Sequence, residues 1–151
     1  MTKKQQQDTF EKLSIILTGF SKADLTGTGM LEPYWSVVQN EISEEVLNSL
    51  LQAIDKLTIK DLEELSVSEL SEVNAIVEQP AFKNVVKQII QLWYLGEWIV
   101  EEYSPQNYIV SSQSYLEGLI WKAIQAHPMG GKQPGFGTWA FPPKTVTTIK
   151  N

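Results

Sequence analysis

The chain has 151 residues and a net charge of −6, and it contains neither cysteine nor arginine. A chain of this length is expected to form one domain and to fold without a metal or a disulfide bond. The missing cysteines exclude Cys-based zinc sites, and the missing arginines remove the best bidentate phosphate ligand, so nucleic acid is not an expected partner.

The two segments that could direct the chain to a membrane are both too polar for that role. The N-terminus MTKKQQQD lacks the apolar core of a secretory signal. The most apolar run, residues 89–100, is interrupted by Gln91, Gly96 and Glu97, and it is too short and polar to span a bilayer. We therefore expect an acidic globular protein without direct membrane insertion.

Apolar residues recur at three- and four-residue intervals from the N-terminus onward, which predicts helices. Asp8 is the expected N-cap of a first helix, with Glu11 as its N3 partner. This helix is expected to end at Gly19 and in a flexible turn over residues 25–29. A short second helix should begin at Pro33.

The second half of the chain repeats this pattern. Ser43 and Ser68 are the expected caps of a third and a fourth helix, and Pro80 is expected to begin a fifth that runs into WYLGEW, residues 93–98. After an irregular SPQNY link, Ser112 should cap a last helix, which Pro128 stops. Alternating runs long enough for a sheet are missing, and residues 108–110 are expected to be at most a lone extended piece.

The predicted fold class is therefore all-α. Residues 1–126 form a helical bundle, and residues 127–151 form an extended, irregular arm rich in glycine, proline and aromatic residues. The two belong to the same structural unit. We call residues 127–151 the C-terminal arm.

Two short motifs resemble ligand-binding loops but lack the necessary context. GFGTWA, residues 135–140, matches G-x-G-x-x-G/A, yet Pro134 precedes it and Pro142 follows, where a dinucleotide site needs a strand and a helix. A calcium loop beginning at Asp24 would carry Trp35 at its twelfth position, where a bidentate glutamate is required. We expect no metal or cofactor in this chain.

The single histidine, His127, follows the last predicted helix. It could serve as a general base or a metal ligand, but no carboxylates lie close to it in the sequence. A histidine at this place more often caps the last helical carbonyls and interacts with the helix dipole. The sequence therefore favours a structural role for His127.

The WYLGEW segment carries more aromatic surface than one core face can take. Trp93 lies on the apolar stripe with Ile89 and Leu92, so we expect it in the core, where Gly96 would allow close packing. Tyr94 and Trp98 lie on other helical faces. At least one of these aromatic residues is therefore expected to meet a partner or the C-terminal arm.

The C-terminal arm differs from an ordinary disordered tail, which is charged and poor in aromatic residues. Its aromatic and methionine side chains are the types enriched at interfaces, and its prolines lower the cost of ordering an extended segment. We expect it to lie on a partner, with packing on its own bundle as the alternative. The predicted partner-binding residues are Tyr94, Trp98, His127, Pro128, Met129, Gly130, Phe136, Gly137, Trp139, Phe141, Pro142 and Pro143.

Three segments carry a family resemblance. LWYLGEW (92–98), IVSSQSYLEGLIWKAIQAHPMG (109–130) and GFGTWAFPP (135–143) resemble the small subunit of membrane-bound FAD-dependent sugar and polyol dehydrogenase complexes, which act on sorbitol, fructose or glucose. FEKLSIILTGF (10–20) resembles the N-terminal part of that subunit. The resemblance implies a helical, non-catalytic accessory subunit.

The resemblance also implies the partners. FAD and the substrate site would belong to the large subunit, and a cytochrome c subunit would take the electrons. The small subunit would help the large one to fold, mature and reach the periplasm. The twin-arginine signal usual in such subunits is not in this sequence, so a cytoplasmic location stays open. Two other functions also stay open: an independent helical interaction module with an unrelated partner, and a small enzyme that uses His127.

Overall fold

The computed structural model describes residues 1–131, and these residues confirm the all-α class. The C-terminal arm beyond residue 131 lies outside the described residues. In chain order the elements are α1 (Lys3–Thr18), α2 (Lys22–Gly27), α3 (Leu31–Glu41), α4 (Glu44–Asp55), α5 (Val67–Val77), α6 (Lys83–Leu95), β1 (Glu97–Trp98), β2 (Tyr108–Ile109), α7 (Ser112–Glu117) and α8 (Leu119–Ala123).

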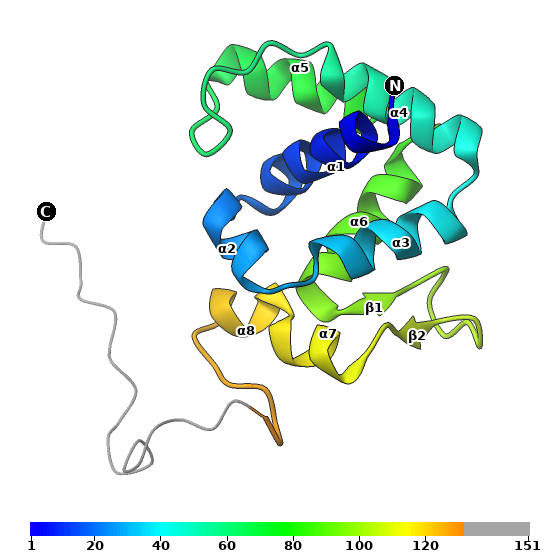
Figure 1. Ribbon diagram of the computed structural model, residues 1–151, viewed down its shortest axis with the longest axis vertical. Coiled ribbons are helices and arrows are strands. Elements are labelled where there is room, and N and C mark those ends of the chain that lie inside the picture. Colours follow the sequence, from blue (N-terminus) through cyan, green and yellow to red (C-terminus); the bar gives the residue numbers. More distant parts are fainter. Residues whose placement is uncertain (132–151) are drawn as a thin grey trace, which may run out of the picture.

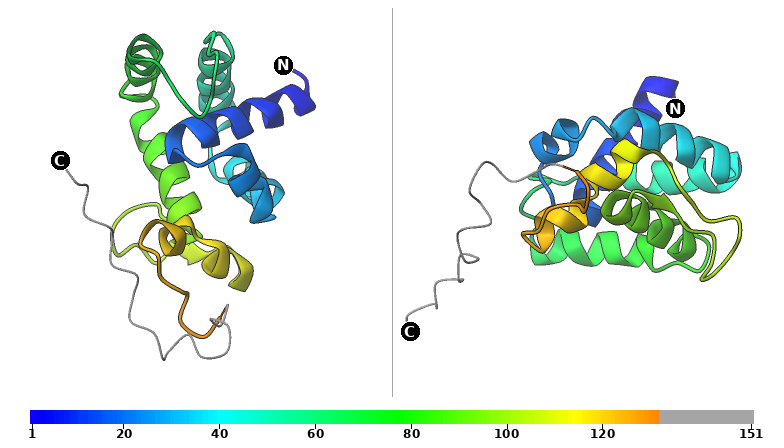
Figure 2. Two further views of the ribbon diagram at one scale, coloured as in Figure 1. Left: turned by 90° about the vertical axis from the view of Figure 1, so that its left-hand side faces the viewer. Right: turned by 90° about the horizontal axis from the view of Figure 1, so that it is seen from below.

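The helices surround α1 and α6. Helix α1 packs against both α4 and α6, and α3 packs against the same two-helix core. Figures 1 and 2 show α4 and α5 at one end of α6, and the hairpin with α7 and α8 at the other. Within the described part of the chain, none of the helices is both long and apolar enough to cross a membrane.

The core is rich in aromatic residues from helices far apart in the sequence. Phe10 of α1 lies 5.2 Å from Trp35 of α3, measured between ring centroids, and Tyr34 meets Trp93 of α6 edge to face at 4.9 Å. Trp93 is 1% exposed, which confirms its predicted place in the core. Edge-to-face contacts of this kind add about 0.5–1.5 kcal/mol to the free energy gained by burial.

Helix α1 begins earlier than the sequence pattern predicted. Thr2, rather than Asp8, is the N-cap: its side chain accepts a hydrogen bond from the Gln5 N–H, and the Gln5 side chain accepts one from the Thr2 N–H at 2.7 Å. This reciprocal capping box satisfies two otherwise free backbone donors. The helix ends at Thr18, and Gly19 follows with φ +70°, as expected.

The segment predicted as a flexible turn is mostly helical. Ser21 caps α2 through a capping box with Asp24, and the helix runs to Gly27. The cap explains the error, because Ser21 and Asp24 have the spacing of a helix start and the glycines follow only at its end. Helix α3 then begins at Leu31, so Pro33 is its third residue rather than its first.

Three more helix starts differ from the predictions by one to three residues. Ser43 precedes α4 as predicted, but Ser66 rather than Ser68 caps α5, again through a capping box, with Glu69. Pro80 lies in the turn before α6, which begins at Lys83. Ser111 rather than Ser112 caps α7.

The segment 97–110 forms a small antiparallel hairpin, which the sequence pattern missed. Glu97 pairs with Ile109, and Trp98 pairs with Tyr108. The predicted extended piece at 108–110 is therefore real but not alone, because Gly96 ends α6 in a left-handed conformation and frees residues 97 and 98 to pair with it. The Tyr108 hydroxyl donates to Glu41 Oε1 at 2.9 Å and ties the hairpin to α3.

Candidate functional site

Gly96 is the point where α6, the hairpin and α7 meet. Its φ is +71°, and a Cβ at this position would lie only 2.3 Å from the Ser114 carbonyl oxygen. Ser114 Oγ donates to the Gly96 carbonyl at 2.8 Å, and the Val110 N–H donates to the same oxygen at 3.0 Å. The predicted close packing at Gly96 is confirmed, and it fixes α7 against the end of α6.

Gly118 divides the last predicted helix into α7 and α8. A Cβ at Gly118 would lie 2.7 Å from the carbonyl oxygen of Tyr94, so α6 passes close to the break. The Trp121 indole N–H donates to the Tyr115 carbonyl at 2.7 Å, and the two rings lie edge to face at 5.4 Å. These contacts hold the short helix α8 across the end of α7.

Helix α8 ends in a Schellman motif rather than in a histidine cap. The Ala126 N–H donates to the Trp121 carbonyl at 2.9 Å, and the Gln125 N–H donates to the Lys122 carbonyl at 3.2 Å. Gln125 has φ +55°. This pattern satisfies the carbonyls that a helix end leaves free. The predicted capping role of His127 is therefore not seen, because Gln125 and Ala126 already perform it.

The first residues of the C-terminal arm fold back onto the bundle. The Gly131 N–H donates to the Pro128 carbonyl at 3.2 Å, and Gly130 has φ +77°, the geometry of a type II turn. Pro128 is buried, and a Cβ at Gly131 would lie 2.0 Å from Leu116 Cδ2 of α7. Pro128 and Gly131 thus lie against the bundle, whereas Met129 between them is exposed.

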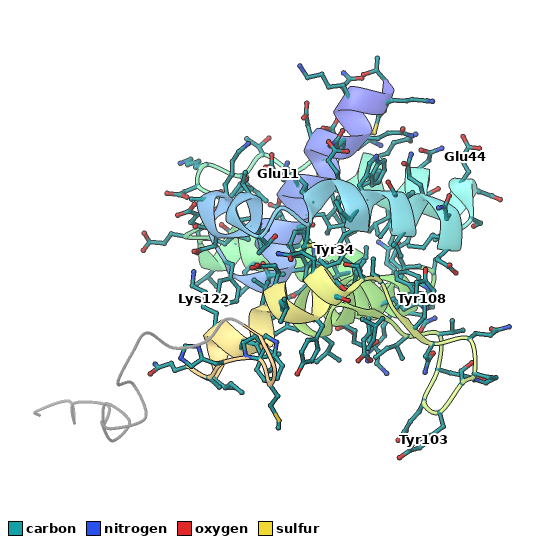
Figure 3. The ribbon with its side chains drawn as sticks, turned by 60° about the horizontal axis from the view of Figure 1, so that its bottom comes forward. Glu11, Tyr34, Glu44, Tyr103, Tyr108 and Lys122 are labelled. Atoms are coloured by element: carbon teal, nitrogen blue, oxygen red, sulfur yellow. The ribbon has the colours of Figure 1, made fainter. Side chains whose placement is uncertain are left out.

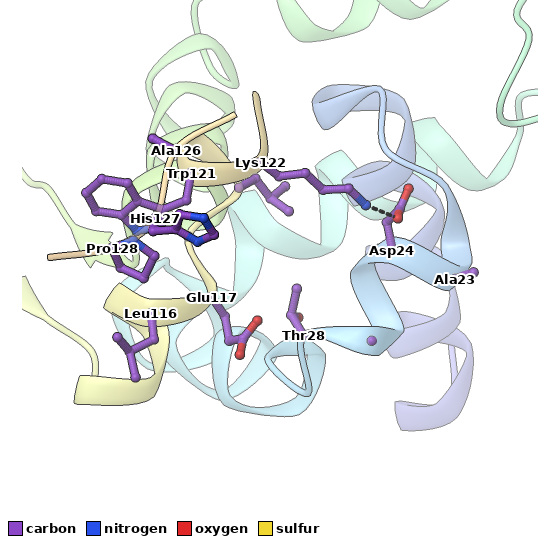
Figure 4. Close-up of a pocket in the computed structure, with 13 residues that line it drawn as sticks. Ala23, Asp24, Thr28, Leu116, Glu117, Trp121, Lys122, Ala126, His127 and Pro128 are labelled. Atoms are coloured by element: carbon purple, nitrogen blue, oxygen red, sulfur yellow. Dashed lines mark hydrogen bonds and ion pairs between the residues drawn. The ribbon is translucent and has the colours of Figure 1, made fainter. Parts of the chain in front are cut away.

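A cleft of about 420 Å³ lies beside this turn, between α2 on one side and α7, α8 and residues 126–128 on the other. Figure 4 shows the His127 ring and the Glu117 carboxylate at its rim, with Lys122 reaching across to Asp24. The ion pair between Lys122 and Asp24 joins residues 98 positions apart. This ion pair joins α8 to α2 across the cleft.

The charges of the cleft are largely paired. Hydrogen bonds from Lys122 and then from Ser21 lower the pKa of Asp24 and so favour its ionised form. The Lys122 ammonium also lies 5.6 Å from the centroid of the Phe20 ring, within cation–π range. Within residues 1–131, no group of three or more His, Asp or Glu side chains could hold a metal ion.

Apolar side chains are exposed next to the cleft. Ile124 at the end of α8 is 56% exposed, and Met129 at the tip of the turn is 84% exposed. Both lie within eight residues of the point where the described chain ends. This surface, Ile124 with His127 and Met129, is the candidate interaction surface.

Tyr94 and Trp98, the two predicted partner-binding residues outside the C-terminal arm, have different surroundings. Tyr94 is half-buried, and its hydroxyl donates to the Thr18 carbonyl at 3.0 Å, so it ties α6 to α1. Trp98 is 1% exposed and lies in the core. A direct contact between Trp98 and a partner is therefore not supported by its position, because the hairpin turns its ring inward.

The structure brings together only part of the predicted set. His127, Pro128, Met129 and Gly130 lie together beside the cleft, whereas Phe136, Gly137, Trp139, Phe141, Pro142 and Pro143 lie outside the described residues. From the sequence, Asp24 was considered only for a calcium loop, and Lys122 was not singled out. Their only signal in the sequence was their opposite charge. Two opposite charges far apart in a chain do not predict a contact unless the fold is known.

The chain belongs to the family described as membrane-bound FAD-containing D-sorbitol dehydrogenase, whose model matches residues 1–125. This family is that of a subunit of a FAD-dependent dehydrogenase complex, which confirms the resemblance stated from the sequence. The chain matches no curated protein and no solved structure.

Proposed function

We propose that this chain is a non-catalytic accessory subunit that binds and stabilises the large flavoprotein subunit of a FAD-dependent sugar or polyol dehydrogenase. The observation that carries the proposal is the exposure of Ile124 and Met129 where the chain leaves the bundle. The aromatic residues Phe136, Trp139 and Phe141 follow within twelve residues of Met129. Exposed apolar side chains concentrated in this way usually mark a protein interface.

The described residues lack the structural unit that forms a typical dinucleotide site. Dinucleotide sites place a pyrophosphate at the N-terminus of a helix that follows a parallel strand and a glycine-rich turn. Residues 1–131 contain one two-stranded antiparallel hairpin and no such unit. Lys122, the lysine that lines the cleft, is already paired with Asp24. These features support placing FAD in the large subunit, where the dehydrogenation would also occur.

The same proposal covers maturation and location. An accessory subunit that buries an apolar surface of its partner stabilises the partner's folded state by mass action. It could in this way assist the folding or export of the large subunit into the periplasm, with a cytochrome c subunit as a further component of the complex. The family description supports a membrane-bound complex as the setting.

Co-expression tests the proposal. A tagged large flavoprotein subunit from the same source would be produced alone, with the full chain, and with residues 1–131 only. We expect the full chain to co-purify with the flavoprotein and to raise the yield of FAD-loaded protein, and residues 1–131 to do so less well. A flavoprotein that is equally abundant without the chain, and that does not retain it, would refute the accessory role.

A further inference from the structure

The loop between β1 and β2, residues 99–107, is a second exposed feature, and it is not part of the candidate interaction surface. Figure 3 shows it extending away from the bundle, with Tyr103 at its far end. Tyr103 is 93% exposed, more than any other large hydrophobic side chain of the described residues. An aromatic ring in this position buries no surface of its own chain.

Internal hydrogen bonds hold the loop in shape. The Asn107 side chain accepts from the Val100 N–H at 2.8 Å and donates to the Glu101 carbonyl at 2.7 Å. Two backbone turns close the loop further, from Ser104 N–H to the Glu101 carbonyl and from Asn107 N–H to the Ser104 carbonyl. Tyr103 is therefore presented on a preorganised support, which lowers the entropic cost of binding through it.

The backbone at Tyr103 is unfavourable for the residue it carries. Its φ is +59°, a left-handed conformation that glycine adopts at little cost and tyrosine does not. Glycine would suit this position better in the isolated chain. Tyr103 is the third residue of the Glu101–Ser104 turn, a position that takes a positive φ and favours glycine. A tyrosine there, 93% exposed, gains almost no burial from its own chain to offset that cost, which points to a contact outside it.

The charges around Tyr103 indicate the chemistry of that contact. Glu101 and Glu102 are exposed beside it, and residues 88–121 include no lysine. The neighbouring α3 also lacks lysine, and its Glu41 accepts the hydrogen bond from Tyr108 of the hairpin. The ring therefore stands on an acidic surface, which complements a basic one.

We propose that the β1–β2 loop is a second contact with the large flavoprotein subunit, in which Tyr103 enters a hollow lined by lysine or arginine side chains. The ring would supply apolar area and a cation–π contact, and Glu101 and Glu102 would pair with the rim of the hollow. The inference rests on the proposed function, because it takes the flavoprotein as partner. It does not depend on the C-terminal arm, since Figures 1 and 3 show the loop and the Pro128–Gly131 turn on different sides of α7.

The test is a competition during co-expression. Wild-type chain and one variant, distinguished by mass, would be produced in equal amounts with a limiting quantity of the tagged flavoprotein. The ratio of the two chains in the purified complex would be measured by mass spectrometry. The variants are Tyr103→Gly, Tyr103→Phe, the double change Glu101→Gln with Glu102→Gln, and Val67→Ala as the control, because Val67 is 88% exposed on α5.

We expect wild-type chain to exceed Tyr103→Gly at least tenfold in the complex, and Tyr103→Phe and Val67→Ala to compete equally with it. The Tyr103→Gly chain should melt no lower than wild type, because glycine relieves the strained backbone. The glutamate double variant should lose to wild type at low salt and compete better at high salt, since screening weakens exposed charge pairs.

The outcomes separate the two proposals. If wild-type chain does not co-purify with the flavoprotein, the proposed function fails and this inference fails with it. If wild-type chain co-purifies but exceeds the Tyr103→Gly chain less than tenfold in the complex, the inference alone is wrong and the proposed function stands. A Tyr103→Gly chain that melts well below wild type would also overturn it, by showing that the tyrosine serves the chain's own fold.

Discussion

The Trp93 indole N–H donates a hydrogen bond to the Ser14 hydroxyl at 3.0 Å in the middle of the core, although the two residues are 79 positions apart. Ser14 is 0% exposed, and its hydroxyl donates in turn to the Phe10 carbonyl at 2.8 Å. The serine hydroxyl thus satisfies the indole N–H of a fully buried tryptophan. This pair fixes the register of α6 against α1.

Ser14→Ala should destabilise the protein by about 1–3 kcal/mol, because it leaves the buried Trp93 N–H without a partner. The loss should appear as a lower midpoint in urea unfolding followed by Trp fluorescence. Ser49→Ala is the matched control: Ser49 also donates to the carbonyl four residues earlier, but it lies on the exposed side of α4. Equal effects of the two changes would contradict a specific role of the Ser14–Trp93 bond.

Gly96→Ala should be far more damaging than Gly19→Ala, although both glycines have φ near +70°. Gly19 has nothing within 4 Å of the position of a Cβ, so its substitution should cost only the left-handed backbone strain of about 1–2 kcal/mol. At Gly96 the added methyl group would also meet the Ser114 carbonyl, which cannot move without displacing α7. Thermal melting followed by circular dichroism compares the two variants. Similar melting temperatures would show that α7 moves away from the added methyl group at little cost in stability.

The sequence predicts the helical faces of this fold better than it predicts the helix ends. Apolar spacing correctly placed Trp93 in the core on the stripe with Ile89 and Leu92, because burial of a periodic stripe decides such positions. Helix starts were missed where two capping residues competed, as at Ser66 and Ser68. Only the local backbone decides which hydroxyl meets a free N–H.

The candidate site was less predictable than the core. His127 and Met129 were singled out from composition, and both are exposed beside the cleft. The cleft itself depends on Asp24 of α2, next to the segment 25–29 that was read as a turn, and on Lys122 of α8. The inward position of Trp98 depends on the hairpin, whose two-residue strands are too short to leave an alternating pattern. Both features arise from tertiary packing, which local spacing does not report.

Glu69 should make the protein more sensitive to acid. Hydrogen bonds from the Ser66 side chain, and from the backbone of Lys60 and Ser66, lower the pKa of Glu69 from 4.5 to about 2. A depressed pKa means that the ionised form favours the folded state. Its contribution to stability is therefore complete above pH 4.5 and is lost as the pH falls toward 2.

Unfolding midpoints at pH 6, 3 and 2 would test this effect. We expect Glu69→Gln to flatten the loss of stability between pH 4.5 and 2, because glutamine has no titrating group. Its single carbonyl oxygen can keep the Ser66 contacts of the capping box but not the bond from the Lys60 N–H as well, so the variant should be less stable than wild type at pH 6. Glu72→Gln is the control, because it removes one exposed carboxylate from the same helix and leaves the hydrogen bonds of Glu69 in place. An identical pH dependence of wild type and Glu69→Gln would show that the carboxylate does not support the cap.

Two truncations should separate folding from binding. A chain ending at Gly131 should melt like the full chain, because residues 1–131 include the bundle and the turn that packs on Leu116. A chain ending at Gln125 should stay helical but melt lower, since it loses the Ala126 N–H bond to Trp121 and the buried Pro128. Both should lose in competition for the flavoprotein. A chain ending at Gly131 that competes equally with the full chain would exclude the aromatic residues 136–141 as anchors.

His127→Gln should change neither the melting temperature nor the chemistry of the complex. The Schellman bonds of Gln125 and Ala126 already satisfy the end of α8, so the exposed ring is not needed as a cap. Glutamine keeps hydrogen-bonding capacity but cannot take up a proton near neutral pH, so it distinguishes a contact role from acid–base catalysis.

The measurement is substrate turnover per intact large–small pair, after free large subunit has been removed. Fewer pairs with unchanged turnover would make His127 a contact residue. A fall in turnover of about a hundredfold or more per pair, with normal flavin content, matches the rate lost when a general acid or base is removed. It would mean that His127 reaches the reacting atoms and that the chain is not a purely accessory subunit.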